Sequence, residues 1–117
     1  MSERVFVYGL LRAGEGLGHI LDSLPRTGPH RLDGFALYDL GRYPGAVPAP
    51  ATIVGELCEV PHAAILDALD AAEGVNEDPP LYVREQVEVD GQPAWIYVYD
   101  RPVGDAPRIV SGDWLNR

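Results

Sequence analysis

The stretch PHAAILDALDAAE, Pro61–Glu73, predicts the main helix of this 117-residue chain and, by its place between strand-like segments, the class of the fold. Successive residues of a helix are turned by roughly 100°, so Glu73 lies about 20° from Leu66 and about 40° from Leu69, on the apolar side. Asp67 falls on the opposite, polar side, as expected for a surface acid of a half-buried helix. One carboxyl group is therefore predicted to face the core.

The surroundings of Glu73 predict a raised pKa for its carboxyl group. Gly74 follows at the position where helices commonly end, which puts Glu73 in the last turn, where the helix dipole disfavours negative charge. Burial acts in the same direction. A carboxyl group with a raised pKa can accept and return a proton near neutral pH, as general acid/base catalysis requires. From the helix alone, a solvated residue at a frayed helix end stays open as the alternative.

The segments before and after this helix predict short strands joined by turns rich in glycine and proline. Asp90-Gly91 is a strong hairpin signal, and Gly34 marks a bulge. Gly41–Pro50 carries three prolines and two glycines and predicts a loop. A short helical stretch is predicted at His19–Leu24, after the glycine-rich loop Ala13–Gly18. The predicted strands are Glu3–Leu10, Arg31–Leu40, Thr52–Val60, Tyr82–Val89 and Pro93–Tyr99.

These elements predict an α+β fold, a small mixed or antiparallel, partly closed β-barrel with one or two short helices. The length predicts a single domain, residues 1–117. Cys58 and Trp95 are expected in the core. The tail Pro107–Arg117 is expected to pack down through its apolar side chains, which are Ile109, Val110, Trp114 and Leu115.

Composition and charge exclude several classes of function. The net charge of -9 repels a phosphate backbone, which disfavours nucleic-acid binding. No apolar run approaches the roughly 20 residues needed to span a membrane. The start, MSERVFVYG, lacks the pattern of a secretory signal, so a cytoplasmic location is expected. Cys58 is the only cysteine, which excludes an internal disulfide and a cysteine-based metal site.

The known motifs for nucleophilic catalysis, metal binding and nucleotide binding are missing from the sequence. There is no nucleophile-elbow pattern around a serine, and the three histidines show no metal-ligand spacing. Gly9–Gly18 lacks both the dinucleotide fingerprint and the ending of a phosphate-binding loop. What is left is a strand-to-loop turn, Gly9–Arg12, with exposed main-chain NH groups, and the carboxyl group of Glu73. These parts suit a reaction in which the substrate carries its own nucleophile.

Four stretches resemble the γ-glutamylcyclotransferase-like family, and together they span nearly the whole chain. VFVYGLLR at Val5–Arg12 is similar to the family's signature loop, and LDAAEGV at Leu69–Val75 is similar to the end of its catalytic helix. LDGFALYDLGRYPGAVP at Leu32–Pro48 and IVSGDWLNR at Ile109–Arg117 resemble further regions of the short bacterial members. The first two are the specific motifs, because they carry the family's site.

The resemblance implies a function without metal or other cofactor: release of a γ-glutamyl group as 5-oxoproline when its own α-amine attacks the γ-carbonyl. It implies that Glu73 is the general acid/base. It also implies that main-chain NH groups of Tyr8, Gly9, Leu10 and Leu11 bind the substrate. The implied substrate is a γ-glutamyl amine or a γ-glutamyl peptide.

Leu10 departs from the family, since many relatives have a hydroxyl residue there. If only its NH group acts, the change is compatible with turnover. A binding module for a small carboxylate ligand on the same fold is the alternative, and a scaffold for a basic partner is a third. Secondary site candidates are Arg12, Tyr43, Tyr82 and Arg84. No nucleic-acid or membrane partner is expected, and a homodimer is left open.

Overall fold

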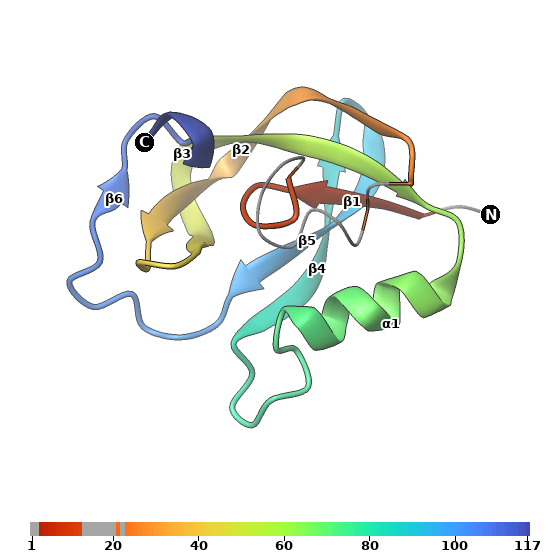
Figure 1. Cartoon of the computed structure of the whole chain (residues 1–117). Coiled ribbons are helices and arrows are strands. Elements are labelled where there is room, and N and C mark those ends of the chain that lie inside the picture. The colour runs from red at the N-terminus through yellow and green to blue at the C-terminus, as the bar shows by residue number, and fades with distance from the viewer. Residues whose placement is uncertain (1–2, 13–20, 22) are drawn as a thin grey trace.

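Figure 1 shows the computed structural model, which describes residues 3–12, 21 and 23–117. Within these residues, one curved sheet of six strands carries a single α-helix and a short C-terminal 3₁₀ helix, η2. The strands are β1 (Glu3–Val7), β2 (Arg26–Asp39), β3 (Pro44–Val60), β4 (Tyr82–Val89), β5 (Gln92–Tyr99) and β6 (Arg108–Ile109); the helices are α1 (Ala63–Ala72) and η2 (Trp114–Asn116).

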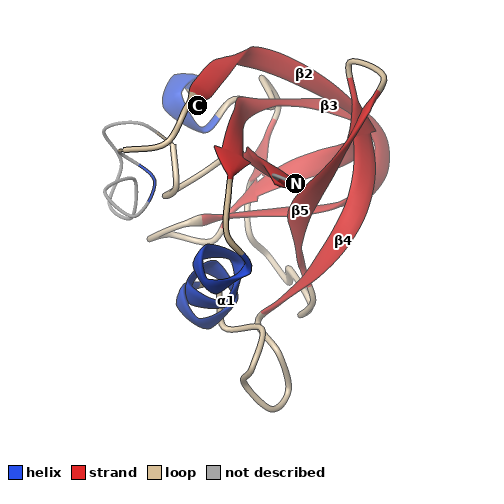
Figure 2. Cartoon of the chain, turned by 90° about the vertical axis from the view of Figure 1, so that its right-hand side faces the viewer, coloured by secondary structure: helices blue, strands red, loops and turns tan. Residues whose placement is uncertain are grey.

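The sheet is mixed, with strand order β4-β5-β1-β3-β2-β6. Of the strand pairs in the described residues, only β1 and β5 are parallel; the others are antiparallel. The sheet curls into a half-barrel, and α1 lies outside it (Figure 2). Across the curl, the Nδ1 atom of His30 at the start of β2 lies 2.7 Å from Oδ2 of Asp90 in the β4–β5 turn. The predicted α+β class with a mixed, partly closed barrel is confirmed.

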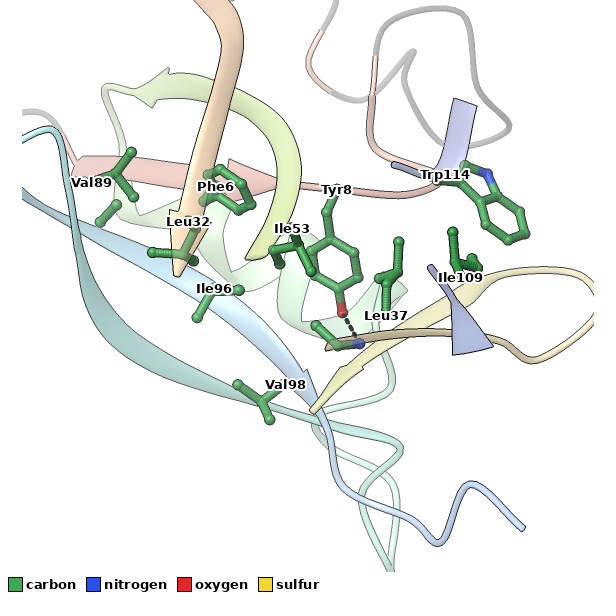
Figure 3. Packing of buried hydrophobic residues seen from close by; sticks show 12 residues of the cluster. Phe6, Tyr8, Leu32, Leu37, Ile53, Val89, Ile96, Val98, Ile109 and Trp114 are labelled. Carbon is green, nitrogen blue, oxygen red and sulfur yellow. Dashed lines mark hydrogen bonds between the residues drawn. The ribbon is translucent and has the colours of Figure 1, made fainter. Parts of the chain in front are cut away.

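β1 is buried on both faces because it lies between two hydrophobic clusters. Phe6 and the following Tyr8 belong to the cluster inside the half-barrel (Figure 3). Val5 and Val7 point the other way and pack in a second cluster with α1, which contributes Leu66 and Leu69. This alternation is the two-residue period of a strand. The chain that leaves β1 stays in contact with both clusters, because Tyr8 belongs to the first and Leu11 to the second.

The loop predicted at Gly41–Pro50 is wrong from Pro44 onward. β3 begins at Pro44 and pairs with β2, with Pro48 opposite Phe35. β1 pairs only with the second half of β3, from Glu56 onward, so among the described residues the first half has no strand on its other side. Prolines, which lack a donor NH, are tolerated on such an edge. β2 also begins earlier than predicted, at Arg26, and the predicted bulge at Gly34 is confirmed by a register shift there.

The predicted helix Pro61–Glu73 is present but shorter. His62 and Glu73 are its cap residues, and Pro61 precedes the helix instead of occupying its first turn. The β4–β5 hairpin closes at Asp90-Gly91 as predicted, with both residues at positive φ. The segments predicted at Ala13–Gly18 and His19–Leu24 lie largely outside the described residues. No described helix is long and apolar enough to cross a membrane.

Burial in the tail differs from the prediction at two positions. Ile109 and Trp114 are buried, but Val110 is 91% exposed and Leu115 is 49% exposed. Val110 directly follows the buried Ile109 of β6, and Leu115 directly follows the buried Trp114 of η2. In elements this short, the next side chain points to the other side. Cys58 is fully buried, whereas Trp95 is only partly buried and donates a hydrogen bond from Nε1 to Glu3.

Candidate functional site

A cavity of about 110 Å³ lies where β1 ends beside the C-terminal end of α1. It brings together the residues that the sequence assigns to catalysis and substrate binding, and two of the four secondary candidates. Arg12 and Arg84 are not among its lining residues. The lining residues are Phe6, Val7, Tyr8, Gly9, Leu10, Leu11, Tyr43, Pro44, Ala72, Glu73, Leu81, Tyr82 and Tyr97.

Glu73 reaches the cavity because α1 ends sharply at this residue. Gly74 takes a left-handed conformation, φ 70°, and its NH donates to the carbonyl of Ala71 at 3.3 Å. The NH of Val75 donates to the carbonyl of Asp70 at 3.0 Å. These two bonds form a Schellman motif, in which glycine is the usual residue after the cap. The local sequence thus fixes the residue at which the helix stops.

Burial raises the pKa of the Glu73 carboxyl group from its ordinary value of 4.5 to about 7. Glu73 is partly buried, and it is the only carboxylic acid among the lining residues of the cavity that the structure describes. Burial also raises the pKa values of Tyr8 and Tyr82, and the nearby charge of Glu73 adds to both shifts. The two tyrosines therefore stay neutral, while Glu73 exchanges its proton near neutral pH.

The tyrosine hydroxyl groups connect the walls of the cavity. The Tyr8 hydroxyl donates to the carbonyl of Tyr97 at 2.6 Å and accepts from the NH of Ala46 at 3.2 Å, the bond drawn in Figure 3. The Tyr82 hydroxyl donates to the carbonyl of Pro44 at 2.5 Å. Since their donor hydrogens are used in these bonds, both tyrosines hold the shape of the cavity.

The turn Gly9–Arg12 forms a second wall of the cavity through Gly9, Leu10 and Leu11. The NH of Arg12 donates to the carbonyl of Gly9 at 3.0 Å and closes the turn. A side chain at Gly9 would place its Cβ 2.5 Å from Cγ of Pro44, so only glycine fits. Within the described part of the chain, the NH groups of Leu10 and Leu11 donate to no main-chain acceptor. Free NH groups of a turn are suited to bind a carboxylate or a developing oxyanion.

The two arginine candidates lie behind the walls of the cavity. Arg12 is 5% exposed and forms ion pairs with Glu56 and Asp113. Arg84 lies behind the helix wall, where its Nε is 3.1 Å from Oδ1 of Asp70 and its guanidinium stacks 4.5 Å from the ring centre of Trp95. Their contacts are those of supporting residues.

Sequence reasoning did not single out Glu56 or Arg26, which also support the turn. One signal was present: Glu56 shares its side of the predicted strand with Val54, Cys58 and Val60, an unusual setting for a carboxylate. No described group of three or more His, Cys, Asp and Glu side chains is arranged to hold a metal ion. Of the loop Asn76–Leu81, only Leu81 lines the cavity.

Comparisons with known proteins show the family of this chain. A family model described as gamma-glutamyl cyclotransferase, AIG2-like, matches residues 5–116. The gamma-glutamylcyclotransferase family protein YtfP of Escherichia coli K12 is 40% identical over 97% of both chains. The solution NMR structure of the E. coli protein superposes with a TM-score of 0.77, again over 97% of both chains.

Two more distant structures share the fold. A crystal structure from Pyrococcus horikoshii is 26% identical and has a TM-score of 0.83, covering 97% of this chain and 91% of that one. An AIG2-like protein from Mus musculus is 22% identical with a TM-score of 0.70, covering 92% of this chain and 85% of that one. The fold around the cavity is therefore found in bacterial, archaeal and mammalian proteins.

Proposed function

Because the chain belongs to the gamma-glutamyl cyclotransferase, AIG2-like family, we propose that it releases 5-oxoproline from a γ-glutamyl amine or γ-glutamyl peptide. The observation that carries this proposal is the Glu73 carboxyl group, which lines the cavity with a pKa raised to about 7. A group of this pKa exchanges protons readily at the pH of most cells.

The reaction needs one proton carrier. The Glu73 carboxylate takes a proton from the substrate's α-ammonium group, which becomes a nucleophilic amine. The amine nitrogen attacks the γ-carbonyl carbon and closes the five-membered ring, and the ring nitrogen then releases its second proton to solvent. The bond from this carbon to the leaving nitrogen then breaks, and Glu73 gives its proton to that nitrogen. The carboxylate is regenerated, so the proposed cycle consumes no cofactor.

The turn would supply binding and charge stabilisation. NH groups of Tyr8, Gly9, Leu10 and Leu11 are proposed to hold the α-carboxylate and the oxygen of the reacting carbonyl. Leu10 takes part through its NH group, so a hydroxyl at this position is not required. Since nucleophile and carbonyl belong to one molecule, holding the substrate in a bent conformation accounts for much of the acceleration.

The size of the cavity supports a small bound group. A volume of about 110 Å³ has room for a group of several non-hydrogen atoms, such as the glutamyl part of a substrate. The leaving amine would then extend past the less buried lining residues, Leu10, Tyr43 and Leu81. This arrangement is consistent with leaving groups of different sizes.

The test is 5-oxoproline release from γ-glutamyl amines and γ-glutamyl dipeptides, with Glu73→Gln beside the parent protein. We expect turnover to fall by about 10²–10⁴-fold in the variant, the usual contribution of a general acid/base, while substrate still binds. Asp67→Asn is the matched control, because Asp67 is exposed on the same helix. Equal release by parent and Glu73→Gln would contradict the proposed role.

Leu10 gives one observation in favour of a second candidate, a binding module for a small carboxylate ligand. If the parent binds γ-glutamyl compounds but releases no 5-oxoproline, this second function is the correct one. The same experiment therefore separates the two.

A further inference from the structure

Four charged side chains from distant parts of the chain meet behind the turn Gly9–Arg12. Oε1 of Glu56 lies 2.8 Å from Nη1 of Arg26, and Oε2 of Glu56 lies 3.2 Å from Nε of Arg12. Nη1 of Arg12 is 2.8 Å from Oδ1 of Asp113. We call Arg12, Arg26, Glu56 and Asp113 the charge network. Glu56 is its centre, because its two oxygens contact both arginines.

The charge network holds the turn through two of its residues, Leu11 and Arg12. Arg12 is itself the last residue of the turn. Arg26 donates from Nη1 to the main-chain carbonyl of Leu11 at 2.9 Å. Because the carbonyl of Leu11 and the NH of Arg12 belong to the same peptide unit, this bond fixes the plane of the peptide that closes the turn. The orientation of the preceding NH groups depends on that plane.

Because the charge network is largely buried, its ion pairs are costly to break. The side chains of Arg12, Arg26, Glu56 and Asp113 are 6%, 14%, 14% and 24% exposed. Two positive and two negative groups balance one another. Removing one partner of a buried pair leaves an uncompensated charge, whose cost is far larger than that of a surface pair.

The sheet register explains how Glu56 comes to lie behind the turn. Glu56 pairs with Val7, the last residue of β1, and Cys58 pairs with Arg26 at the start of β2. The strands approach very closely here, since a Cβ built on Gly55 would lie 2.4 Å from the carbonyl oxygen of Val7. β3 thus presents Glu56 at a fixed place between the end of β1 and the start of β2.

The charge network does not line the catalytic cavity. Its members line a separate cleft, whereas Leu10 and Leu11 face the cavity. We propose that Glu56 is a positioning residue, which sets the NH groups of the turn for substrate binding by holding Arg12 and Arg26. This inference rests on the proposed function, because it assigns substrate binding to the turn.

The experiment compares Glu56→Gln with Glu59→Gln. Both changes remove one negative charge from β3, but Glu59 is 49% exposed and lies 3.9 Å from its partner Arg4. We expect kcat/KM for 5-oxoproline release to fall by about 10–100-fold in Glu56→Gln, with a raised KM, because small displacements of a binding group have effects of this size. Glu59→Gln should stay within about twofold of the parent.

Two further readouts distinguish positioning from general loss of structure. The pH midpoint of kcat/KM should be the same in Glu56→Gln and the parent, since Glu73 lies on the other wall. In NMR spectra without substrate, the amide signals of Leu10 and Leu11 should shift more than those of α1. Asp113→Asn loses only one ion pair, the one with Arg12, and should show the same pattern more weakly. This second variant tests the inference if Glu56→Gln does not fold.

Each outcome supports or overturns the positioning role of Glu56. Unchanged kcat/KM and unchanged turn amides in Glu56→Gln, or in Asp113→Asn if the first variant does not fold, overturn the inference. A moved pH midpoint with unmoved turn amides also overturns it, since the effect would then reach Glu73 instead. If the parent releases no 5-oxoproline, the proposed function fails. The amide shifts and the affinity for γ-glutamyl compounds then decide the positioning role on their own.

Discussion

The two walls of the cavity are built in different ways. The helix wall, which carries Glu73, is fixed by bonds between near neighbours, such as those from the NH groups of Glu73 and Val75 to the carbonyls of Leu69 and Asp70. The turn wall is held by side chains that are 15, 44 and 101 residues away from their partners. The proton carrier thus depends on local sequence, while the binding wall depends on the completed tertiary structure.

The strongest way to break the turn wall is Gly9→Ala. The added Cβ would lie 2.5 Å from Cγ and 2.8 Å from Cδ of Pro44, atoms of a ring closed onto the backbone and not the far end of a flexible side chain. We expect a loss of about 1–3 kcal/mol in unfolding free energy from overpacking, and about 100-fold lower turnover from displacement of the turn. Urea unfolding and 5-oxoproline release measure the two effects.

Gly41→Ala is the control for this change, because no atom lies within 4 Å of the added Cβ and only the positive φ is strained. It should lose stability without losing turnover per folded molecule. A Gly9→Ala protein as active as Gly41→Ala would show that the close contact with Pro44 does not set the turn.

The helix wall predicts a pH dependence of stability. In the unfolded chain Glu73 titrates near 4.5, and in the folded chain near 7, so the folded state binds more protons between these pH values. Stability from this group is therefore fully present below about pH 4.5 and is lost as the pH rises to about 7. The difference is on the order of 3 kcal/mol.

Urea unfolding from pH 4 to pH 8 measures this dependence, with Glu73→Gln as reference. The variant cannot ionise at this position, so its stability relative to the parent should rise across the window and level off above about pH 7. Parallel curves of unfolding free energy against pH for the two proteins would mean that burial does not disfavour the charged form of Glu73.

Gly74→Ala tests the sharp end of α1. The position has φ 70°, which costs a residue with a side chain about 1–2 kcal/mol. The nearest atom to the added Cβ is Oε2 of Glu77, the end of a flexible side chain that can rotate away. We expect this loss of stability in thermal unfolding, with a smaller loss of turnover than in Gly9→Ala. Turnover lost to the same degree would show that the helix wall is as sensitive as the turn wall.

The smallest effect is expected from Tyr97→Phe, which removes a hydrogen bond that supports the helix wall. The Tyr97 hydroxyl donates to Oδ1 of Asp70 at 2.7 Å, and the ion pair of Asp70 with Arg84 survives its removal. One lost hydrogen bond costs about 0.5–1.5 kcal/mol. Tyr99→Phe on the same strand is the control for chemical denaturation. A larger loss, with a shifted pH midpoint of turnover, would mean that this bond also sets the position of Glu73.

The same difference between the walls explains which parts were predictable from sequence. The position of Glu73 on the apolar side of a helix, the stop at Gly74 and the hairpin at Asp90-Gly91 all follow from signals within a few residues. The mixed, partly closed barrel followed from the number and shortness of the strand-like segments.

The errors have a common physical cause, since each depends on a partner far along the chain. Pro44 and Pro48 look like loop residues until the free edge of β3 is known. Arg12 stays a candidate of the site, and its ion pairs with Glu56 and Asp113 could not be read from its sequence neighbours. The exposure of Val110 likewise depends on which neighbour the two-residue strand β6 pairs with. Local patterns do not contain this information.

The pair formed by Arg12 and Asp113 has a consequence for the order in which the protein is made. Synthesis proceeds at about 5–20 residues per second, so 101 residues separate the two partners by roughly 5 to 20 seconds on the ribosome. During that time β1 also waits for its parallel neighbour β5. The binding wall therefore cannot be complete until Asp113 has been synthesised, 101 residues after Arg12.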